Sequence, residues 1–261
     1  RVVGPVGTIS TTDAFNSTDT SNPNTNADNN DNGIGITSNS VSAGILTMTP
    51  GSVGALANNI VSNATGTTGN PTVDFGFVYP YALGNRVWFD TNNNSQIDFA
   101  NEVGVDGVTV DLYAADVTGS PSGPIIATDI TTNGGYYLFD NLIPGDYVVV
   151  LPSSNFSGTG VLTGYWSSAT SRAADGTISE TTAALAETNT DSDDNGTRQT
   201  SGGFADAVIS SAVTLGPIGL VEPANESDLE TGMGQGVQPD GRANMTVDFG
   251  FYRVEMGNLV F

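Results

Sequence analysis

The sequence predicts an all-β protein made of tandem antiparallel Greek-key β-sandwich domains with long loops. Short runs rich in β-branched and aromatic residues recur along the chain, and clusters of Gly, Pro, Asn and Asp separate them. A long internal repeat indicates more than one copy of the same unit. Only residues 181–187, with three alanines and a leucine, are compatible with a helical turn.

The strongest single strand pattern is at residues 108–113. There Val108, Val110 and Leu112 alternate with polar or amphipathic side chains, as in a half-buried strand. Asn-Gly-Gly at 133–135 lies between two predicted strands and indicates a hairpin, and Pro-Gly-Asp at 144–146 indicates another turn. The remaining predicted strands are 86–89, 125–130, 136–139, 147–151, 207–215 and 246–252.

The internal repeat is carried by a six-residue motif. Residues 72–77 (TVDFGF) recur unchanged at 246–251. Each copy is followed by a similar segment, LGNRVW at 83–88 and MGNLVF at 256–261. The two motifs therefore mark the same place in two copies of one unit.

The repeat sets the expected domain boundaries. We expect residues 1–79 to be the C-terminal part of one repeat and residues 82–253 to be a complete repeat. Residues 254–261 are expected to be the first strand of a following repeat, or a strand donated to a neighbouring subunit. Head-to-tail or tandem copies of the same chain are thus the first expected partners, and strand addition between them would produce a filament.

Composition excludes most catalytic chemistry. The 261 residues contain no cysteine and no histidine, and all six basic residues are arginines. A Ser-His-Asp or Cys-His nucleophile, a zinc site with His or Cys ligands, a Schiff-base lysine and a disulfide framework all lack a required residue type. We expect no enzymatic activity.

The net charge of −22 indicates which partners the chain can have. Nucleic acid and anionic membrane surfaces are recognised by clustered Lys and Arg, so neither is expected as a partner. No run of about 20 uncharged apolar residues is present, so no membrane insertion is expected. Cations are the partners that such a charge favours.

Several strings resemble one family of extracellular repeats. They are LGNRVWFD at 83–90, GVTVDL at 107–112, GYYLFDNLIPGDY at 135–147 and VDFGFY at 247–252. With them the chain resembles the SdrD B-like or Cna-B-like repeat of bacterial surface adhesins. The resemblance implies small Ig-like or prealbumin-like sandwiches that act as stalks at the cell surface, outside the cell. The Lys–Asn isopeptide bond of some members is excluded, because the chain has no lysine.

The acidic loop after the first predicted strand is a candidate calcium site. Residues 90–98 (DTNNNSQID) place oxygen side chains at positions 1, 3, 5 and 9, in the order of an EF-hand-like loop, and the resemblance implies Ca²⁺ here. Ser95 stands where a glycine is usual, and the glutamate falls one position late. The alternative is a polar turn whose side chains cap their own backbone. The candidate ligands are Asp90, Asn92, Asn94, Gln96 through its carbonyl, Asp98, Glu102 and Asp106.

A second acidic loop occurs in both copies of the repeat. It contains Asp-Asn-Gly at 194–196 and again at 31–33. The alternatives are a second Ca²⁺ site and a solvated Asn-Gly turn without metal. Bound calcium would neutralise concentrated carboxylates and replace the missing covalent links. The candidate ligands are Asp191, Asp193, Asn195, Asp28, Asn30 and Asn32.

Seven sequons make glycosylation a further expectation of an exported surface. They lie at Asn16, Asn63, Asn93, Asn155, Asn195, Asn225 and Asn244. Tyr165 and Trp166 follow a glycine in a long loop and are open to three interpretations: core filling, an inter-domain contact or a platform for a sugar.

Two functions remain open. The first is an exported, calcium-stabilised structural protein that acts as stalk, matrix or filament. The second is an adhesin module whose loops, such as 153–184, bind a glycan or an extracellular protein.

Overall fold

The computed structural model describes residues 2–10, 33–34, 40–43, 75–181, 183–185, 193–216, 222–223 and 236–253. The chain divides into two compact units, residues 1–80 and residues 81–261. The strand expected at 254–261 lies outside the described residues, and its addition to a neighbour stays a prediction.

The first unit contains two small antiparallel sheets. One has the order β1 (Val2–Val3), β4 (Ser40–Ala43), β3 (Gly33–Ile34). In the other, β2 (Ile9–Ser10) pairs with β5 (Phe77–Val78). Phe77 ends the first copy of the TVDFGF motif, so this copy runs into a strand.

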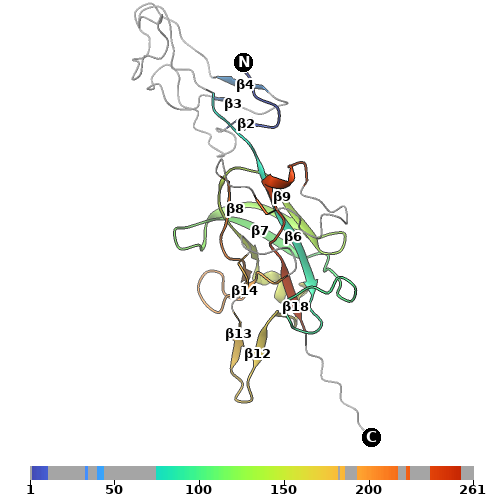
Figure 1. The fold of residues 1–261 in the computed structure, drawn as a ribbon. Coiled ribbons are helices and arrows are strands. Elements are labelled where there is room, and N and C mark those ends of the chain that lie inside the picture. Colours follow the sequence, from blue (N-terminus) through green and yellow to red (C-terminus); the bar gives the residue numbers. More distant parts are fainter. Residues whose placement is uncertain are drawn as a thin grey trace, which may run out of the picture. The chain divides into compact units, whose positions relative to one another are not determined.

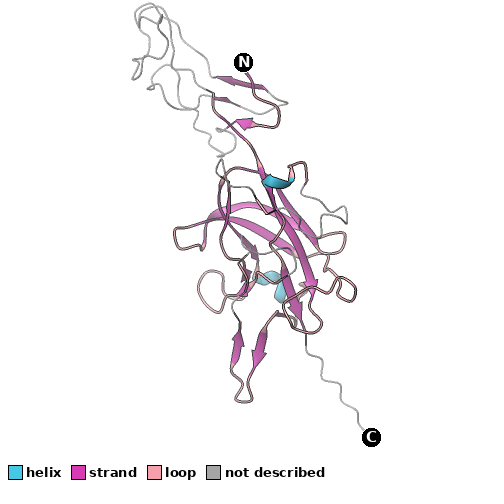
Figure 2. Cartoon of the chain, viewed as in Figure 1, coloured by secondary structure: helices cyan, strands magenta, loops and turns pink. Residues whose placement is uncertain are grey.

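Two larger sheets make up the second unit, and strands dominate it in Figures 1 and 2. The first sheet has the order β14 (Thr197–Arg198), β15 (Val208–Ile209), β10 (Gly145–Leu151), β7 (Thr109–Ala115), β8 (Pro121–Ile130), with β16 (Val213–Leu215) also on β10. The second has the order β11 (Trp166–Ser167), β18 (Phe249–Tyr252), β6 (Tyr81–Phe89), β17 (Ala243–Asn244), with β9 (Tyr136–Leu142) also on β6. A separate hairpin joins β12 (Thr170–Arg172) to β13 (Ile178–Glu180), and the helical turns η1 (Ser153–Phe156) and η3 (Asp240–Arg242) complete the described elements.

The two sheets bury one shared core between them. Val110 and Leu112 of β7 are fully buried, together with Val108 just before this strand, which confirms the alternation predicted at 108–113. They belong to the same apolar cluster as Val87 of β6 and Phe249 of β18 on the other sheet. Each fully buried side chain of this kind contributes about 1.5–3 kcal/mol. The predicted all-β sandwich is confirmed.

One part of the second sheet is parallel. β6 pairs in parallel with β17 and with β18, whereas its other neighbour β9 is antiparallel. Parallel neighbours require a long crossover connection. The whole segment between β6 and β17 supplies it, so the first and last strands of the unit lie side by side.

The turn at 133–135 is closed as a hairpin turn, by reciprocal backbone hydrogen bonds between Thr132 and Tyr136, but the flanking strands do not go on to pair with each other. β8 and β9 flank it, but β8 pairs with β7 and β9 pairs with β6, so the turn carries the chain from one sheet to the other. Its glycines explain this path. A Cβ on Gly135 would collide with the carbonyl oxygen of Val87, so only glycine lets the chain pass this closely to β6.

Two other expectations change in detail. The strand predicted at 207–215 is two strands, β15 and β16, with a break between them. Within the segment expected to form a helical turn, residues 181 and 183–185 are described and are not helical.

Candidate functional site

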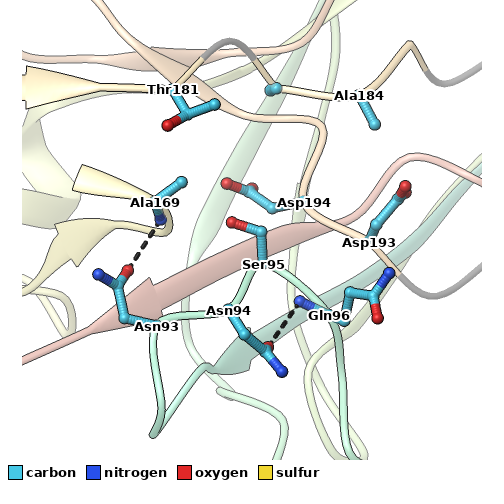
Figure 3. A pocket seen from close by; sticks show the side chains of 10 residues that line it. Asn93, Asn94, Ser95, Gln96, Ala169, Thr181, Ala184, Asp193 and Asp194 are labelled. Atoms are coloured by element: carbon cyan, nitrogen blue, oxygen red, sulfur yellow. Dashed lines mark hydrogen bonds between the residues drawn. The ribbon is translucent and has the colours of Figure 1, made fainter. Parts of the chain in front are cut away.

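The two acidic loops of the second unit lie against each other. Gln96 of the first loop forms an isolated antiparallel bridge with Asp193 of the second, and Asp194 N donates to Ser95 O at 3.1 Å. Between the loops is a cavity of about 440 Å³. Its lining, drawn in Figure 3, consists of Asn93, Asn94, Ser95, Gln96, Ala169, Thr181, Ala183, Ala184, Asp193 and Asp194.

Asp90, which follows β6, organises the first loop. Its carboxylate is buried and accepts hydrogen bonds from Asn94 N at 3.2 Å and Ser95 N at 2.9 Å. A third bond comes from Ser168 Oγ at 2.8 Å. Ser95 has φ +60°, so the left-handed position that usually requires glycine is occupied here by serine. Asp90 therefore caps its own loop and ties it to the segment after β11.

Glu102 closes the same loop from its far end. It is buried, its Oε1 accepts from Thr91 N at 2.7 Å, and its Oε2 accepts from Asp98 N at 2.9 Å. The Asp98 carboxylate accepts from the side-chain amide of Asn101 and from the N–H of Ala100, and these bonds lower the pKa of Asp98. These contacts are the self-capping pattern of a polar turn.

The other ligands predicted around this loop are less closely gathered. Asn94 Oδ1 accepts from Gln96 N at 3.0 Å, and the side chain of Asn92 is exposed. Asp106 Oδ1 accepts from Gly134 N and Gly135 N, both at 2.8 Å. Asp106 thus holds the turn between β8 and β9.

The second loop buries a carboxylate. Asp194 is 4% exposed, and its Oδ1 accepts from Gly196 N and Gly250 N, both at 3.1 Å. Burial raises the pKa of Asp194 well above its usual range, and the negative charges of Glu180 and Asp90 add to this effect. The loop therefore holds a carboxyl group whose charge no basic side chain of the cavity lining neutralises.

Ser95 adds an unsatisfied oxygen to the same cavity. Its Oγ is buried and finds no hydrogen-bond partner within the described residues. Figure 3 shows this hydroxyl and the Asp194 carboxylate close to one another, from opposite loops. A buried polar group without a partner is costly unless a water or an ion satisfies it.

The residues fit a hard cation in type but only partly in number. Every candidate donor is an oxygen, which is what Ca²⁺ prefers. Yet in the part of the chain that the structure describes, no three acidic side chains converge closely enough to hold a metal ion. Backbone carbonyls and water would have to supply the remaining ligands. Four predicted ligands lie outside the described residues: Asp28, Asn30, Asn32 and Asp191.

Sequence reasoning missed the most constrained members of this site. The alternate-position pattern favours Asp193 and Asn195 and does not single out Asp194, and at Ser95 the sequence indicates only the absence of the usual glycine. The repetition of Asp-Asn-Gly at 31–33 and 194–196 was the available signal for Asp194. No local signal places Ser95 opposite it.

Three described sequons have buried side chains. Asn155, Asn195 and Asn244 are 4%, 1% and 1% exposed. Asn155 Nδ2 donates to Thr109 O, and Asn195 Nδ2 donates to Ala184 O. A glycan at these positions would have to be attached before folding. Asn93 is half-buried, and its amide donates to a backbone carbonyl as well. The remaining sequons, Asn16, Asn63 and Asn225, lie outside the described residues.

The two adjacent aromatics of the long loop lie in different surroundings. Tyr165 stacks on Phe89 with ring centroids 4.6 Å apart and packs against the core. The guanidinium of Arg253 lies 5.1 Å from the Tyr165 ring. Trp166 is half-buried in the edge strand β11 and lines a second cavity.

No helix among the described residues is long and apolar enough to cross a membrane.

Comparison with known proteins finds a match within the second unit. Residues 81–202 match the family model of the SdrD B-like domain. Serine-aspartate repeat-containing protein I of Staphylococcus saprophyticus is 40% identical over 96 residues, which is 36% of this chain and 4% of that protein. Colossin-B of Dictyostelium discoideum is 31% identical over 138 residues, 46% of this chain and 4% of that protein. The chain thus spans a small fraction of the length of these relatives.

Among solved structures, a minor pilin of the Gram-positive pathogen Streptococcus agalactiae is similar over 78% of this chain and 66% of its own. The identity is 13% and the TM-score is 0.25.

Proposed function

We propose that the chain is part of a non-catalytic extracellular surface protein, in which the segment that matches the SdrD B-like domain, residues 81–202, is a calcium-stabilised structural module. Its role is to hold other parts of the surface protein away from the cell, as a stalk or matrix element. Copies of the same unit are its first partners.

The observation that supports calcium most strongly is the uncompensated charge between the two loops. The carboxylates of Asp90 and Asp194 are both buried, and none of the residues that line the cavity is basic. A cation in this cavity would neutralise Asp194, which lines it, and would give Ser95 Oγ a partner. It would also link two loops that are about 100 residues apart in sequence, and because it binds only the folded state it stabilises that state by mass action.

The ligands available at the site also indicate its affinity for calcium. Affinity for Ca²⁺ rises with the number of charged ligands, and the described residues contribute few. We therefore expect a dissociation constant of about 10⁻⁴–10⁻³ M, the range of extracellular modules.

Thermal melting tests the proposal. We expect the melting temperature to fall when a chelator removes calcium, and to recover with Ca²⁺ but not with NaCl of the same ionic strength. At a calcium concentration of about 100 times the dissociation constant the stabilisation is about 2.7 kcal/mol. An unchanged melt in chelator would contradict the proposal.

A pair of variants assigns the effect to the cavity. Asp194→Asn removes the buried charge and is expected to abolish most of the calcium-dependent rise in melting temperature. Asp240→Asn changes the net charge equally at an exposed carboxylate of η3 and should leave the rise intact. Equal responses of the two variants would show that calcium acts on the overall charge instead.

A second candidate function, a module that binds a glycan, is favoured by a specific observation. The second cavity combines an indole ring with hydrogen-bonding groups at the base of the β12–β13 hairpin.

A further inference from the structure

The second cavity lies where the β12–β13 hairpin joins the sandwich. Its volume is about 420 Å³, which is in the usual range for small-molecule sites. The hairpin extends beyond the sheets of its unit (Figure 1). Trp166 of β11, Ile178 of β13 and Arg198 of β14 contribute walls of the cavity.

The apolar part of the lining is partly exposed. Ile178 is 53% exposed, and the indole of Trp166 is half-buried. A planar ring beside an aliphatic side chain offers a flat apolar surface at the cavity wall.

The polar part of the lining contains hydrogen-bond donors. Trp166 and Thr170, which line the cavity, carry an indole N–H and a hydroxyl. The Arg198 guanidinium donates from Nη2 to Asp206 Oδ1 at 2.7 Å, and its side chain remains 34% exposed. The cavity therefore presents N–H and O–H donors.

An acceptor is fixed opposite these donors. Both oxygens of the Glu180 carboxylate accept from Arg198 N, at 3.3 and 3.0 Å, which holds the group in place. Burial raises the pKa of Glu180, and the contacts with Ser167 and Arg198 oppose this shift. A carboxyl group here can accept from a ligand hydroxyl.

We propose that this cavity, lined by Trp166, Thr170, Ile178, Glu180 and Arg198, binds a neutral saccharide unit of an extracellular glycan. The C–H face of a pyranose ring packs on the indole and on Ile178. Ring hydroxyls accept from Trp166, Thr170 and Arg198 and donate to Glu180. This proposal rests on the second candidate function and names the class of ligand that the module would bind.

Charge decides between a neutral and an anionic sugar. Arg198 is already paired with Asp206, and Glu180 lies in the same cavity. With a net charge of −22 on the chain, an anionic sugar would meet repulsion without a free counter-charge. Hydroxyl groups, which both donate and accept, match the mixed set of donors and acceptors better.

Tryptophan fluorescence makes a direct test possible. The chain has two tryptophans, and Trp88 is fully buried. A ligand in the cavity therefore changes the emission of Trp166 alone. The full chain in Ca²⁺ is titrated with the neutral polysaccharides mannan, galactan, laminarin and dextran, with the anionic polysaccharides alginate and heparin, and with gelatin. We expect a saturable emission change with at least one neutral polysaccharide.

Variants assign the binding to the cavity. Thr170→Val keeps the side-chain volume but removes the hydroxyl, and Ile178→Ser removes the aliphatic wall. Each is expected to weaken binding about tenfold, as the loss of one good contact does. Ile125→Ser is the matched control, because Ile125 is an isoleucine of similar exposure, 49%, on β8. Its affinity should equal that of the wild type. Thermal melts show that each variant is folded.

The inference is overturned if no neutral polysaccharide changes the emission, if only an anionic polysaccharide or gelatin does, or if Thr170→Val and Ile178→Ser bind as the wild type does. The same samples separate this failure from failure of the structural proposal. If the melting temperature depends on calcium but no polysaccharide binds, only the proposed saccharide site is overturned.

Discussion

At the scale of single residues, a buried polar side chain can make the backbone hydrogen bonds that a neighbouring strand would otherwise make at the end of a strand. Asn155 in η1 is an example. Its Oδ1 accepts from Thr109 N at 3.0 Å and its Nδ2 donates to Thr109 O at 2.8 Å, so one amide imitates a strand neighbour at the first residue of β7. The rest of the ladder of β7 depends on this start.

Asn155→Ala is expected to destabilise the unit by about 2 kcal/mol, because it leaves two backbone groups of Thr109 unpaired in a partly buried place. Urea denaturation measures the loss. Ser154→Ala, at the exposed neighbouring position of η1, should stay within about 0.5 kcal/mol of the wild type. A loss in Ser154→Ala as large as that in Asn155→Ala would indicate an effect of the helical turn instead.

Glu180 gives a prediction about pH. Its pKa is raised by burial above the ordinary value of 4.5. The folded state then binds the proton more tightly than the unfolded state, so the stability from this group is present below the unfolded pKa and is lost as pH rises through the folded pKa. Glu180→Gln cannot ionise and should escape this loss.

The free energy of unfolding of Glu180→Gln minus that of the wild type should therefore increase from about pH 4 to about pH 7. Urea titrations of both proteins at each pH give this difference, in which other titrating groups cancel. A difference that shrinks as pH rises would show that ionised Glu180 stabilises the fold.

At the scale of elements, the sequence predicts where strands and turns lie well, but it predicts poorly which strands pair with each other. The alternation at 108–112 is enough to predict a strand, because burial of every second residue requires one. The turn at 133–135 is not enough to predict how its flanking strands pair, since the tight turn is the same whether they pair with each other or with distant strands. Packing of glycine backbone against β6 decides the outcome, and that is a tertiary contact.

In the candidate site, too, the sequence predicts the local loop but not the contacts between loops. The Asp90 loop is recognisable because its oxygens lie close together in sequence. The contact between Ser95 and Asp194 depends on the bridge between two loops and on burial beneath β18, which no local pattern encodes.

Gly250 in β18 is a direct test of packing between elements. A Cβ there would collide with Ser168 Oγ and lie 2.7 Å from Trp88 Cζ2, and Trp88 is fully buried. Gly250→Ala should cost about 1–3 kcal/mol, because neither neighbour can withdraw without disturbing the core.

The measurement is chemical denaturation, with Gly203→Ala as control. No atom lies within 4 Å of a Cβ at Gly203, and its backbone is not left-handed. A neutral Gly250→Ala would mean that the core around Trp88 relaxes more easily than its burial implies.

At the scale of the whole molecule, the composition acquires a more specific meaning. From the sequence alone, a charge of −22 predicts that neither nucleic acid nor an anionic membrane surface is a partner. The structure adds that part of this charge is buried, at Asp90 and Asp194, between two loops of one unit. Solubility needs only exposed charge, so the buried carboxylates call for a different reason, and the bound cation that we propose is one.

The parallel pairing of β6 with β17 and β18 has a mechanical consequence. β6 opens the unit and β18 ends its described part, and the two strands run in the same direction side by side. Tension applied to the two ends pulls these strands past each other along their length. Their hydrogen bonds are then loaded together, in shear, whereas an antiparallel hairpin loaded at its open end unzips one bond at a time. Force spectroscopy should therefore record a higher rupture force when the unit is pulled from residues 81 and 252 than when it is pulled across β12 and β13, where the bonds open in sequence.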